Sequence, residues 1–271
     1  MKSSPYLICS TFSYNGYLEY GRNFLRSYLN FASDIPLCLV IDNEVLFDLI
    51  NSDFDLSSFM LVKNSYINEI DCLCLKRATF DNEHKFKYSP EKFVYKPSSL
   101  MTLLAGGHCD GFKYLVWVDG DSVFLKSGLG NLLNYISPKP NQIASVFDRL
   151  DYRNHLEAGL MVFNLAHVQT EKYIFDVLDC FLSGKIFSML EWHDAFIFTH
   201  YINSRPPDSF RLLCIEFNIK GDHPIATWDE SKKYLDHLKG RRKRLGFSPE
   251  TISNTLYRKI LVLLAKIKSL F

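Results

Sequence analysis

The chain has 271 residues, of which 47% are hydrophobic and 15% aromatic, and this is ample for the core of one large domain or two small ones. Its 31 Lys and Arg residues nearly balance 30 Asp and Glu residues, so the net charge of +1 excludes a global electrostatic bias towards nucleic acid. No apolar run approaches the roughly 20 residues that span a bilayer, and residues 1–5 lack the basic and apolar regions of a signal peptide.

Short runs of apolar, β-branched and aromatic residues, typical of buried strands, recur through the first half of the chain. They occupy residues 6–10, 37–41, 59–62 and 114–118. Helical spacing of apolar residues predicts helices at about 18–30, 46–50 and 98–105, while residues 11–16 are predicted to form a polar loop. Residues 63–92 are polar and mixed in pattern, and they support no assignment.

The same two patterns continue in the second half. Helices are predicted at 129–136, 171–182 and 194–201. Strands are predicted at 142–147, 159–164 and 212–217, and residues 221–246 are loop-like. Strands that alternate with helices argue for one α/β domain, in which helices flank a mixed, mostly parallel sheet.

The end of the chain differs from the domain before it. From Ile252 to Phe271 the apolar residues fall on one helical face, basic residues flank that face, and four more basic residues stand at 241–244. Such a helix lies in the plane of an anionic membrane surface. The alternative is that its apolar face packs back onto the domain. We therefore predict a domain at 1–247 and a basic amphipathic helical tail at 248–271.

Two carboxylates follow the strand predicted at 114–118, in the sequence Asp119-Gly120-Asp121. Carboxylates are rarely buried unless they are paired or bind a metal. Ligands in open α/β sheets bind just outside the carboxyl ends of the strands, so this pair should face a ligand. Gly120 lets the backbone turn, which allows both carboxylates to converge on one hard cation. The alternative is a polar turn, because Asp-Gly is also a common turn dipeptide.

Two segments resemble motifs of one enzyme family. They are Val118-Asp-Gly-Asp121, after an aromatic strand, and Asp236-His-Leu-Lys-Gly240, followed by Lys243. Both are similar to motifs of nucleotide-sugar-dependent glycosyltransferases of the GT-A fold, in the family-8-like branch with glycogenin and the bacterial lipopolysaccharide galactosyltransferases. The resemblance implies a Rossmann-like GT-A sheet. It also implies transfer of a sugar from a nucleotide diphosphate donor, a UDP-sugar, to an acceptor hydroxyl with retention of configuration.

The resemblance assigns a metal site. In the family the Asp-x-Asp pair holds a divalent cation, Mn²⁺ or Mg²⁺, which bridges the two donor phosphates, and Asp119 and Asp121 take that place here. His237 is similar to the histidine that completes the metal shell, and one imidazole beside two carboxylates suits manganese. Gly240 would let backbone amides approach the phosphates, and Lys243 would supply a positive charge. Taken alone, a histidine such as His237 is more often at the surface, and the basic cluster would be a solvated or membrane-facing patch.

Weaker matches imply further donor contacts. Thr11 to Tyr17 follows the first strand, where the family binds the base and ribose, and Tyr14 or Tyr17 would stack on a pyrimidine. Lys96 matches a basic residue that the family places near the donor. The structural alternatives are a tyrosine packed on the following helix and a solvated lysine at the start of a helix.

Two acidic residues are the predicted catalytic groups. Glu157-Ala158-Gly159 resembles the family segment that hydrogen-bonds the donor sugar, with Glu157 as the contact and Gly159 in the donor site at a structural turn. Asp194 matches an aspartate that binds sugar hydroxyls close to the anomeric carbon, although it also suits the N-cap of the helix that it precedes. In relatives a glutamine often follows this aspartate, whereas Ala195 follows it here, so the stereochemical outcome and the identity of any nucleophile stay open.

Two other functions remain open on the sequence. The haloacid-dehalogenase-like phosphatases also carry Asp-x-Asp at a strand end, but theirs lies on the first strand and this one lies more than 110 residues into the chain. The other is a catalytically inactive sugar-nucleotide binder.

For the glycosyltransferase interpretation we expect a nucleotide-sugar donor and a glycan or lipid-linked glycan acceptor, in the synthesis of a cell-surface glycan or lipopolysaccharide. The seven cysteines lie mostly in apolar runs without a Cys-x-x-Cys pair, which predicts reduced thiols in a cytoplasmic protein. Its tail would attach it peripherally to the inner face of a membrane.

Overall fold

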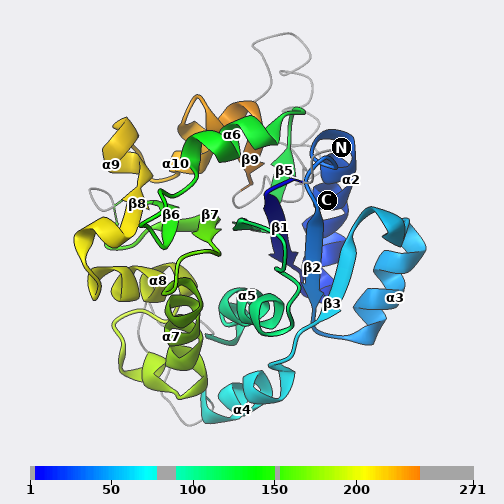
Figure 1. Cartoon of the computed structure of the whole chain (residues 1–271). Coiled ribbons are helices and arrows are strands. Elements are labelled where there is room, and N and C mark those ends of the chain that lie inside the picture. Colours follow the sequence, from blue (N-terminus) through cyan, green and yellow to red (C-terminus); the bar gives the residue numbers. More distant parts are fainter. Residues whose placement is uncertain (1–3, 78–89, 150–152, 239–271) are drawn as a thin grey trace, which may run out of the picture.

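The computed structural model describes residues 4–77, 90–149 and 153–238. Its centre is a seven-stranded sheet with the strand order β3-β2-β1-β4-β7-β6-β8 (Figure 1). The strands are β1 (Tyr6–Thr11), β2 (Leu37–Ile41), β3 (Met60–Lys63), β4 (Tyr114–Val118), β6 (Ala144–Phe147), β7 (Glu157–Asn164) and β8 (Phe210–Leu212). Of these seven strands, β7 alone runs antiparallel to its neighbours, β4 and β6. The predicted mixed, mostly parallel sheet is therefore confirmed.

Helices cover both faces of the sheet (Figure 1). One face carries α4 (Ile67–Arg77), α5 (Tyr95–Ala105), α7 (Thr170–Leu182) and α8 (Asp194–Asn203). The other carries α2 (Arg22–Phe31), α3 (Glu44–Asp53), α6 (Leu129–Ile136), α9 (Leu213–Phe217) and α10 (Pro224–Thr227). Successive strand residues point to opposite faces, so Leu7 and Cys9 join one buried cluster whereas Tyr6 and Ile8 join the other. The central strands β2 and β4 are apolar throughout because both of their faces are covered.

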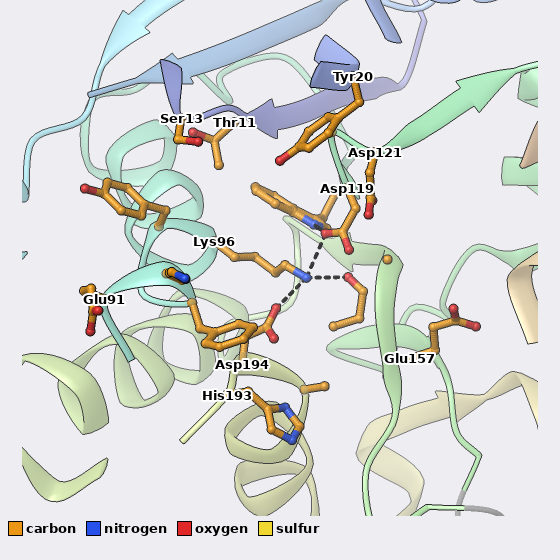
Figure 2. A pocket seen from close by; sticks show the side chains of 18 of the residues that line it. Thr11, Ser13, Tyr20, Glu91, Lys96, Asp119, Asp121, Glu157, His193 and Asp194 are labelled. Atoms are coloured by element: carbon orange, nitrogen blue, oxygen red, sulfur yellow. Dashed lines mark hydrogen bonds and ion pairs between the residues drawn. The ribbon is translucent and has the colours of Figure 1, made fainter. Parts of the chain in front are cut away.

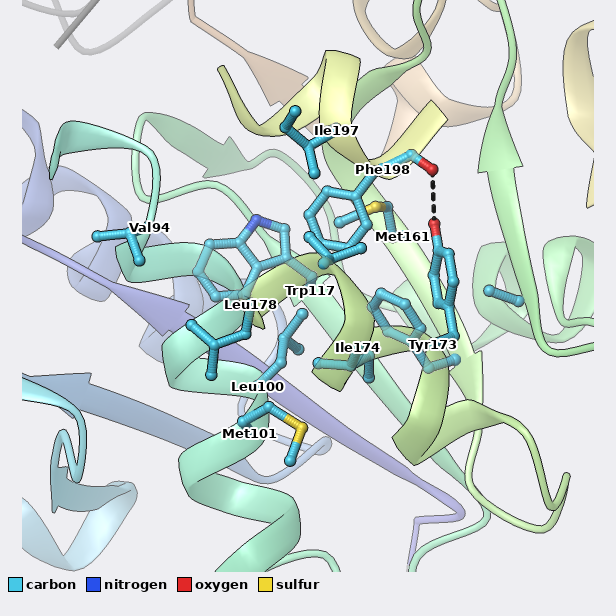
Figure 3. Packing of buried hydrophobic residues seen from close by; sticks show 14 of the residues in the cluster. Val94, Leu100, Met101, Trp117, Met161, Tyr173, Ile174, Leu178, Ile197 and Phe198 are labelled. Carbon is cyan, nitrogen blue, oxygen red and sulfur yellow. Dashed lines mark hydrogen bonds between the residues drawn. The ribbon is translucent and has the colours of Figure 1, made fainter. Parts of the chain in front are cut away.

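The buried cluster on the α5, α7 and α8 face fixes the end of β4. Trp117 of β4 is 2% exposed and lies with Leu178 of α7 and Phe198 of α8 (Figure 3). Tyr173 of α7 donates its hydroxyl hydrogen to the carbonyl oxygen of Phe198 at 3.1 Å. This packing holds β4 against α5 and α8, two helices that carry residues of the predicted site.

Most predicted elements are confirmed, with shifted ends. The helix predicted from residue 98 starts at Tyr95, because Pro97 is tolerated in a first turn, where backbone N–H groups have no helical partner. The helix predicted at 46–50 extends over all of α3, whose N-cap Asn43 accepts a hydrogen bond from the Leu46 N–H. The unassigned stretch 63–92 contains α4.

The strand predicted at 212–217 is wrong. Strand β8 ends at Leu212, and the next five residues form helix α9. A short apolar run does not distinguish a buried strand from a buried helical turn. The choice depends on a distant contact, since the Asp148 carboxylate, just beyond β6, accepts a hydrogen bond from the Cys214 N–H at 2.8 Å near the start of this helix.

Two predicted loops contain regular structure. In residues 11–16, helix α1 (Tyr14–Gly16) begins after Ser13, whose hydroxyl oxygen accepts from the Gly16 N–H, and a π-helical turn (Tyr17–Gly21) then leads into α2. In residues 221–246, β9 (Leu235–His237) pairs antiparallel with β5 (Ser122–Phe124), beside α10. A strand of three residues carries too little periodicity to be predicted.

The seven cysteines, which all lie among the described residues, form no disulfide; Cys72 and Cys74 are exposed and the other five are buried. Among the residues that the structure describes, no helix is long and apolar enough to span a membrane. The tail predicted at 248–271 lies outside the described residues.

Candidate functional site

A cleft of about 760 Å³ opens beside the carboxyl ends of β1 and β4 (Figure 2). Its position agrees with the rule that ligands of open α/β sheets bind beyond these strand ends. The predicted site residues that line it are Thr11, Lys96, Asp119, Gly120, Asp121, Glu157, Gly159 and Asp194. Tertiary folding therefore gathers most of the predicted site into one cavity.

The turn after β4 presents the two aspartates. The Asp119 N–H donates to the carbonyl oxygen of Gly159 at 2.9 Å, and the Ser122 N–H donates back to the Asp119 carbonyl at 2.9 Å. A Cβ on Gly120 would collide with the Phe12 ring, so only glycine fits between the carboxylates here. Gly120 therefore lets the turn pass close to Phe12, whose ring fills the space that a side chain at position 120 would need.

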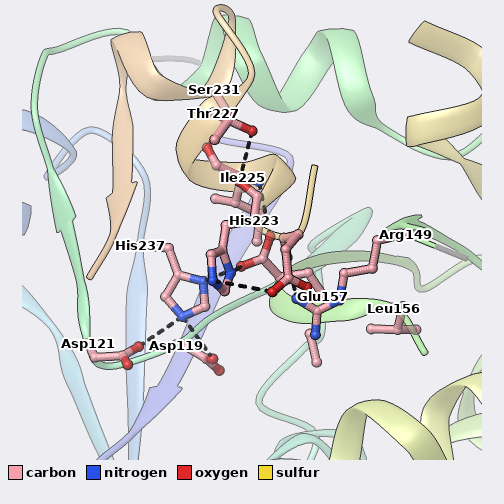
Figure 4. Close-up of polar contacts among 12 residues, drawn as sticks. Asp119, Asp121, Arg149, Leu156, Glu157, His223, Ile225, Thr227, Ser231 and His237 are labelled. Atoms are coloured by element: carbon pink, nitrogen blue, oxygen red, sulfur yellow. Dashed lines mark hydrogen bonds and ion pairs between the residues drawn. The ribbon is translucent and has the colours of Figure 1, made fainter. Parts of the chain in front are cut away.

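His237 reaches the aspartates through strand pairing. In the β5–β9 ladder His237 lies opposite Ser122, and the Leu238 N–H donates to the carbonyl oxygen of Asp121 at 3.0 Å. The His237 Nε2 atom is 3.3 Å from Asp119 Oδ2 and 3.1 Å from Asp121 Oδ1 (Figure 4). The imidazole is 1% exposed, so the alternative of a surface histidine is wrong.

These three residues fit a divalent cation. One ligand atom from each, two carboxylate oxygens and one imidazole nitrogen, lie within 4.8 Å of one another. Two hard oxygen ligands with one nitrogen suit Mn²⁺ better than Ca²⁺ or Mg²⁺.

Lys96 joins Asp119 to Asp194 on the opposite wall of the cleft. Its Nζ atom is 2.9 Å from Asp119 Oδ1 and 2.6 Å from Asp194 Oδ2, and it donates to the carbonyl oxygen of Ala158 at 2.7 Å (Figure 2). Burial lowers the pKa of Lys96, but the two carboxylates outweigh burial and raise the pKa above its ordinary value. Lys96 is thus a buried cation held by two acids, and the alternative of a solvated lysine is wrong.

Asp194 faces the cleft although it begins helix α8. The N-cap of that helix is His193, whose Nδ1 atom accepts a hydrogen bond from the Phe196 N–H at 3.3 Å. The Asp194 carboxylate is consequently available to Lys96, and the N-cap alternative for Asp194 is wrong.

Glu157 lines the cleft, and its carboxylate also contacts His237. Its side chain is 3% exposed; Oε2 accepts from the Ile225 N–H at 3.1 Å, and Oε1 lies 3.1 Å from His237 Nδ1 (Figure 4). A carboxylate engaged in this way contacts the side of the His237 ring that faces away from Asp119 and Asp121. The contact of Glu157 with the donor sugar stays a prediction, and the contacts of its carboxylate in this structure are to Ile225 and His237.

The residues predicted to bind the base and ribose, between Thr11 and Tyr17, line the cleft only in part. Thr11 lines it, and its hydroxyl donates to the Val40 carbonyl at 2.6 Å. Tyr17 is fully buried, and its hydroxyl donates to Asp53 Oδ2 at 2.7 Å, so the prediction that it stacks on a base is wrong. Tyr14 is 41% exposed but is not part of the cleft lining.

Tyr20 lines the cleft, whereas the sequence pointed to Tyr14 or Tyr17 for this place. Burial, then the charges of Asp121 and Asp119, raises the pKa of the Tyr20 phenol, so its hydroxyl stays protonated and can donate a hydrogen bond. The sequence offered no local signal for Tyr20 over Tyr17, because both are aromatic residues in one helical stretch.

The far wall of the cleft holds basic residues that the sequence analysis missed, Arg149, His155 and His193. Burial lowers the pKa of the His155 imidazole, and the nearby His193 and Arg149 lower it further, which favours the neutral ring. His193 Nε2 lies 2.6 Å from Glu191 Oε2.

A second group of side chains is also close enough together to be considered as a metal site: His155, Glu191 and His193. Because His193 Nδ1 accepts from the Phe196 N–H, its Nε2 must carry the ring proton and donate it to Glu191. That nitrogen has no lone pair for a metal, so this group is a hydrogen-bonded pair beside a second histidine. Gly240 and Lys243, the predicted phosphate contacts, lie outside the described residues.

Gly159 makes room for the metal-site histidine. A Cβ at Gly159 would collide with the ring of His237, so we expect Gly159→Ala to displace the ring and weaken Mn²⁺ binding about tenfold or more. Overpacking should also cost about 1–3 kcal/mol of stability. The matched control is Gly130→Ala in α6, where a Cβ meets nothing within 4 Å. Equal Mn²⁺ affinity of Gly159→Ala and wild type, measured by calorimetry, would contradict this steric role.

No protein-family model and no curated protein matches the sequence. Solved structures do match the fold. The chain aligns with the apo WbbM bifunctional glycosyltransferase at a TM-score of 0.53 and 14% identity, over 97% of this chain and 52% of WbbM. It aligns with apo glycosyltransferase GlyE of Streptococcus pneumoniae TIGR4 at 0.52 and 12% identity, over 97% of this chain and 60% of GlyE.

The galactosyltransferase LgtC, in complex with donor and acceptor sugar analogs, matches at a TM-score of 0.52 and 12% identity, over 96% of this chain and 95% of LgtC. The chain thus spans about half of WbbM but nearly all of LgtC. All three neighbours are glycosyltransferases, and each alignment covers at least 96% of this chain. The chain therefore has the GT-A fold of the nucleotide-sugar-dependent glycosyltransferases, of the type seen in LgtC.

Proposed function

We propose that this protein is a glycosyltransferase that moves a sugar from a nucleotide diphosphate donor, a UDP-sugar, to a hydroxyl of a glycan acceptor. The observation that carries the proposal is the convergence of Asp119, Asp121 and His237 at the carboxyl end of β4, where the two aspartates line the cleft of a GT-A fold. The resemblance in sequence implied all three residues as metal ligands. The fold likeness to glycosyltransferases favours this activity over that of a phosphatase.

The three residues would hold Mn²⁺, or Mg²⁺, at the diphosphate. A bound divalent cation stabilises the negative charge that develops on the leaving diphosphate. The protonated Tyr20 hydroxyl would donate a hydrogen bond at the same end of the cleft. Lys96 holds the Asp194 carboxylate at a set place in the cleft wall, where it would orient donor-sugar hydroxyls.

Finer features of the reaction are proposed from the resemblance. We propose retention of configuration, in line with the family-8-like branch, and an acceptor in a cell-surface glycan or lipopolysaccharide. Ala195 offers only a methyl group beside Asp194, so it supplies no side-chain nucleophile.

A screen of nucleotide sugars tests the proposal. With Mn²⁺ present, UDP-sugars should raise the melting temperature and be hydrolysed slowly, and ADP- or GDP-sugars should do so less. Turnover of phosphomonoesters instead would indicate a phosphatase. Stabilisation by UDP-sugars without any hydrolysis or transfer would indicate an inactive binder.

Asp194→Asn should separate chemistry from nucleotide binding. The change keeps the side-chain size but alters the group that faces the sugar, so we expect kcat to fall about 100-fold while the affinity for UDP, which has no sugar, stays near wild type. The exposed Asp208→Asn should change neither quantity. Wild-type turnover by Asp194→Asn would remove this residue from the mechanism.

The tail at 248–271 is proposed to bind an anionic membrane surface, which would suit a lipid-linked acceptor. Each basic residue near such a surface contributes about 1 kcal/mol. A chain ending at Ser248 should keep its melting temperature and donor hydrolysis but lose binding to vesicles that contain phosphatidylserine. If the shortened chain unfolds, or the full chain ignores these vesicles at low salt, the tail packs on the domain instead.

A further inference from the structure

His237 has close contacts at both nitrogens of its ring. While His237 Nε2 faces the two aspartates, the opposite nitrogen, Nδ1, lies 3.1 Å from Glu157 Oε1. Both side chains are nearly inaccessible, at 1% and 3% exposure. Water therefore cannot substitute for this contact.

The Glu157 carboxylate is itself oriented by the backbone. Its second oxygen accepts from the Ile225 N–H at the start of α10, and the residue sits in β7, which is hydrogen-bonded to β4. Gly159, two residues along the same strand and on the same side, leaves the space that the His237 ring occupies. One strand therefore supplies both the surface on which the ring lies and the carboxylate that it bonds.

This arrangement selects one form of the ring. A carboxylate can only accept, so Nδ1 must carry a proton and donate it to Glu157, which leaves the lone pair of a neutral ring on Nε2. Nε2 is the atom between Asp119 and Asp121. Histidine ligands of metals commonly donate their other N–H to a carboxylate, and this contact sets the tautomer and the ring orientation.

We propose that Glu157 is a positioning residue that acts through His237, by holding the imidazole with its Nε2 lone pair directed at the metal. This inference rests on the proposed metal-dependent function. It assigns Glu157 to the cation rather than to the sugar or the reacting atoms. The side chain is expected to set metal affinity, with little direct effect on the nucleotide.

Two simpler roles would also place a carboxylate here. Glu157 could merely add negative charge near the cation, or it could merely tie β7 to the segment that begins at Ile225. A charge effect would survive the removal of His237, and it would survive a shorter acid. A tie between segments would change stability and leave the affinity of the folded protein for metal unaltered.

The test measures Mn²⁺ binding to the full chain from the electron paramagnetic resonance signal of free Mn²⁺, without nucleotide. Glu157→Gln keeps the size of the side chain, and we expect it to weaken Mn²⁺ binding by about 10–100-fold. Glu157→Asp keeps the charge but shortens the reach to Nδ1, and it should weaken binding to a similar degree. In a His237→Ala background, Glu157→Gln should cause no further loss.

A second readout looks at the ligand directly. Electron spin echo modulation of bound Mn²⁺ detects a coordinated imidazole nitrogen, and this signal should be present in wild type and reduced in Glu157→Gln at saturating Mn²⁺. The matched control is Glu191→Gln, which removes the carboxylate partner of His193, another cleft histidine, and should leave affinity and nitrogen signal unchanged. Melting temperatures identify any variant that fails to fold.

Several results would overturn the inference. They are wild-type Mn²⁺ affinity in folded Glu157→Gln, wild-type affinity in Glu157→Asp, an equal loss in the His237→Ala background, or an equal loss in Glu191→Gln. Failure of the proposed function looks different, because the wild-type chain itself would then bind no Mn²⁺. If Glu157→Gln does not fold, the Glu157→Asp arm and its nitrogen signal decide the question.

Discussion

Replacing either Asp121 or His237 by alanine should abolish Mn²⁺-dependent binding of UDP. In the proposed site each side chain would supply one of three ligands, and the loss of a direct ligand should exceed the roughly 10–100-fold loss that follows when a residue supporting a ligand is changed. The fold should survive, because the backbone pairing of β5 with β9 and the bond from Leu238 N–H to the Asp121 carbonyl do not involve either side chain. Calorimetric titration of UDP with and without Mn²⁺ measures the effect.

The control for this experiment is Asp48→Ala, which removes an exposed carboxylate on α3. It corrects for the change in overall charge and should leave Mn²⁺-dependent UDP binding at the wild-type level. Unchanged UDP and Mn²⁺ affinity in both Asp121→Ala and His237→Ala would show that the metal site is misassigned.

Lys96→Met should cost more stability than any other single change in the cleft. Methionine keeps much of the apolar stem but leaves Asp119 and Asp194, on either side of the lost ammonium, without their shared buried cation. Removal of one charged partner from a buried ion pair lowers the free energy of unfolding by about 3–5 kcal/mol. This corresponds to about 10 °C in melting temperature for a chain of this size. Added Mn²⁺ should recover part of the loss, because it supplies positive charge at Asp119.

The pH dependence of this loss follows from the raised pKa of Lys96. A lysine whose pKa is higher in the folded than in the unfolded state stabilises the fold fully below its ordinary value of 10.5, and the contribution disappears only as pH rises through the folded pKa. The difference in stability between wild type and Lys96→Met should therefore be equal at about pH 7 and about pH 9.

Lys92→Met is the matched control, since Lys92 also lines the cleft but is exposed. It should change the melting temperature by little, because exposed charges contribute about 0–1 kcal/mol. A Lys96→Met protein as stable as Lys92→Met would show that the two aspartates do not depend on the ammonium.

The amino-acid sequence by itself determined the central strands of the sheet and the position of the two aspartates of the site. The strands that form β1, β2 and β4 are local apolar runs, and burial on both faces makes such runs visible without any tertiary contact. Asp119 and Asp121 follow one of these strands directly, so their place at its carboxyl end could be read from the chain. His237 was found through a motif and not through any local structural pattern.

Only the tertiary structure decided what surrounds these residues. His237 and Glu157 are 80 residues apart, and they meet because a strand of three residues pairs with β5 and because Gly159 leaves space for the ring. Tyr17 turns into the core while Tyr20 faces the cleft, and His193 rather than Asp194 caps α8. Each of these outcomes depends on contacts between distant segments, whose packing and hydrogen bonds select one of several conformations that the local sequence allows equally well.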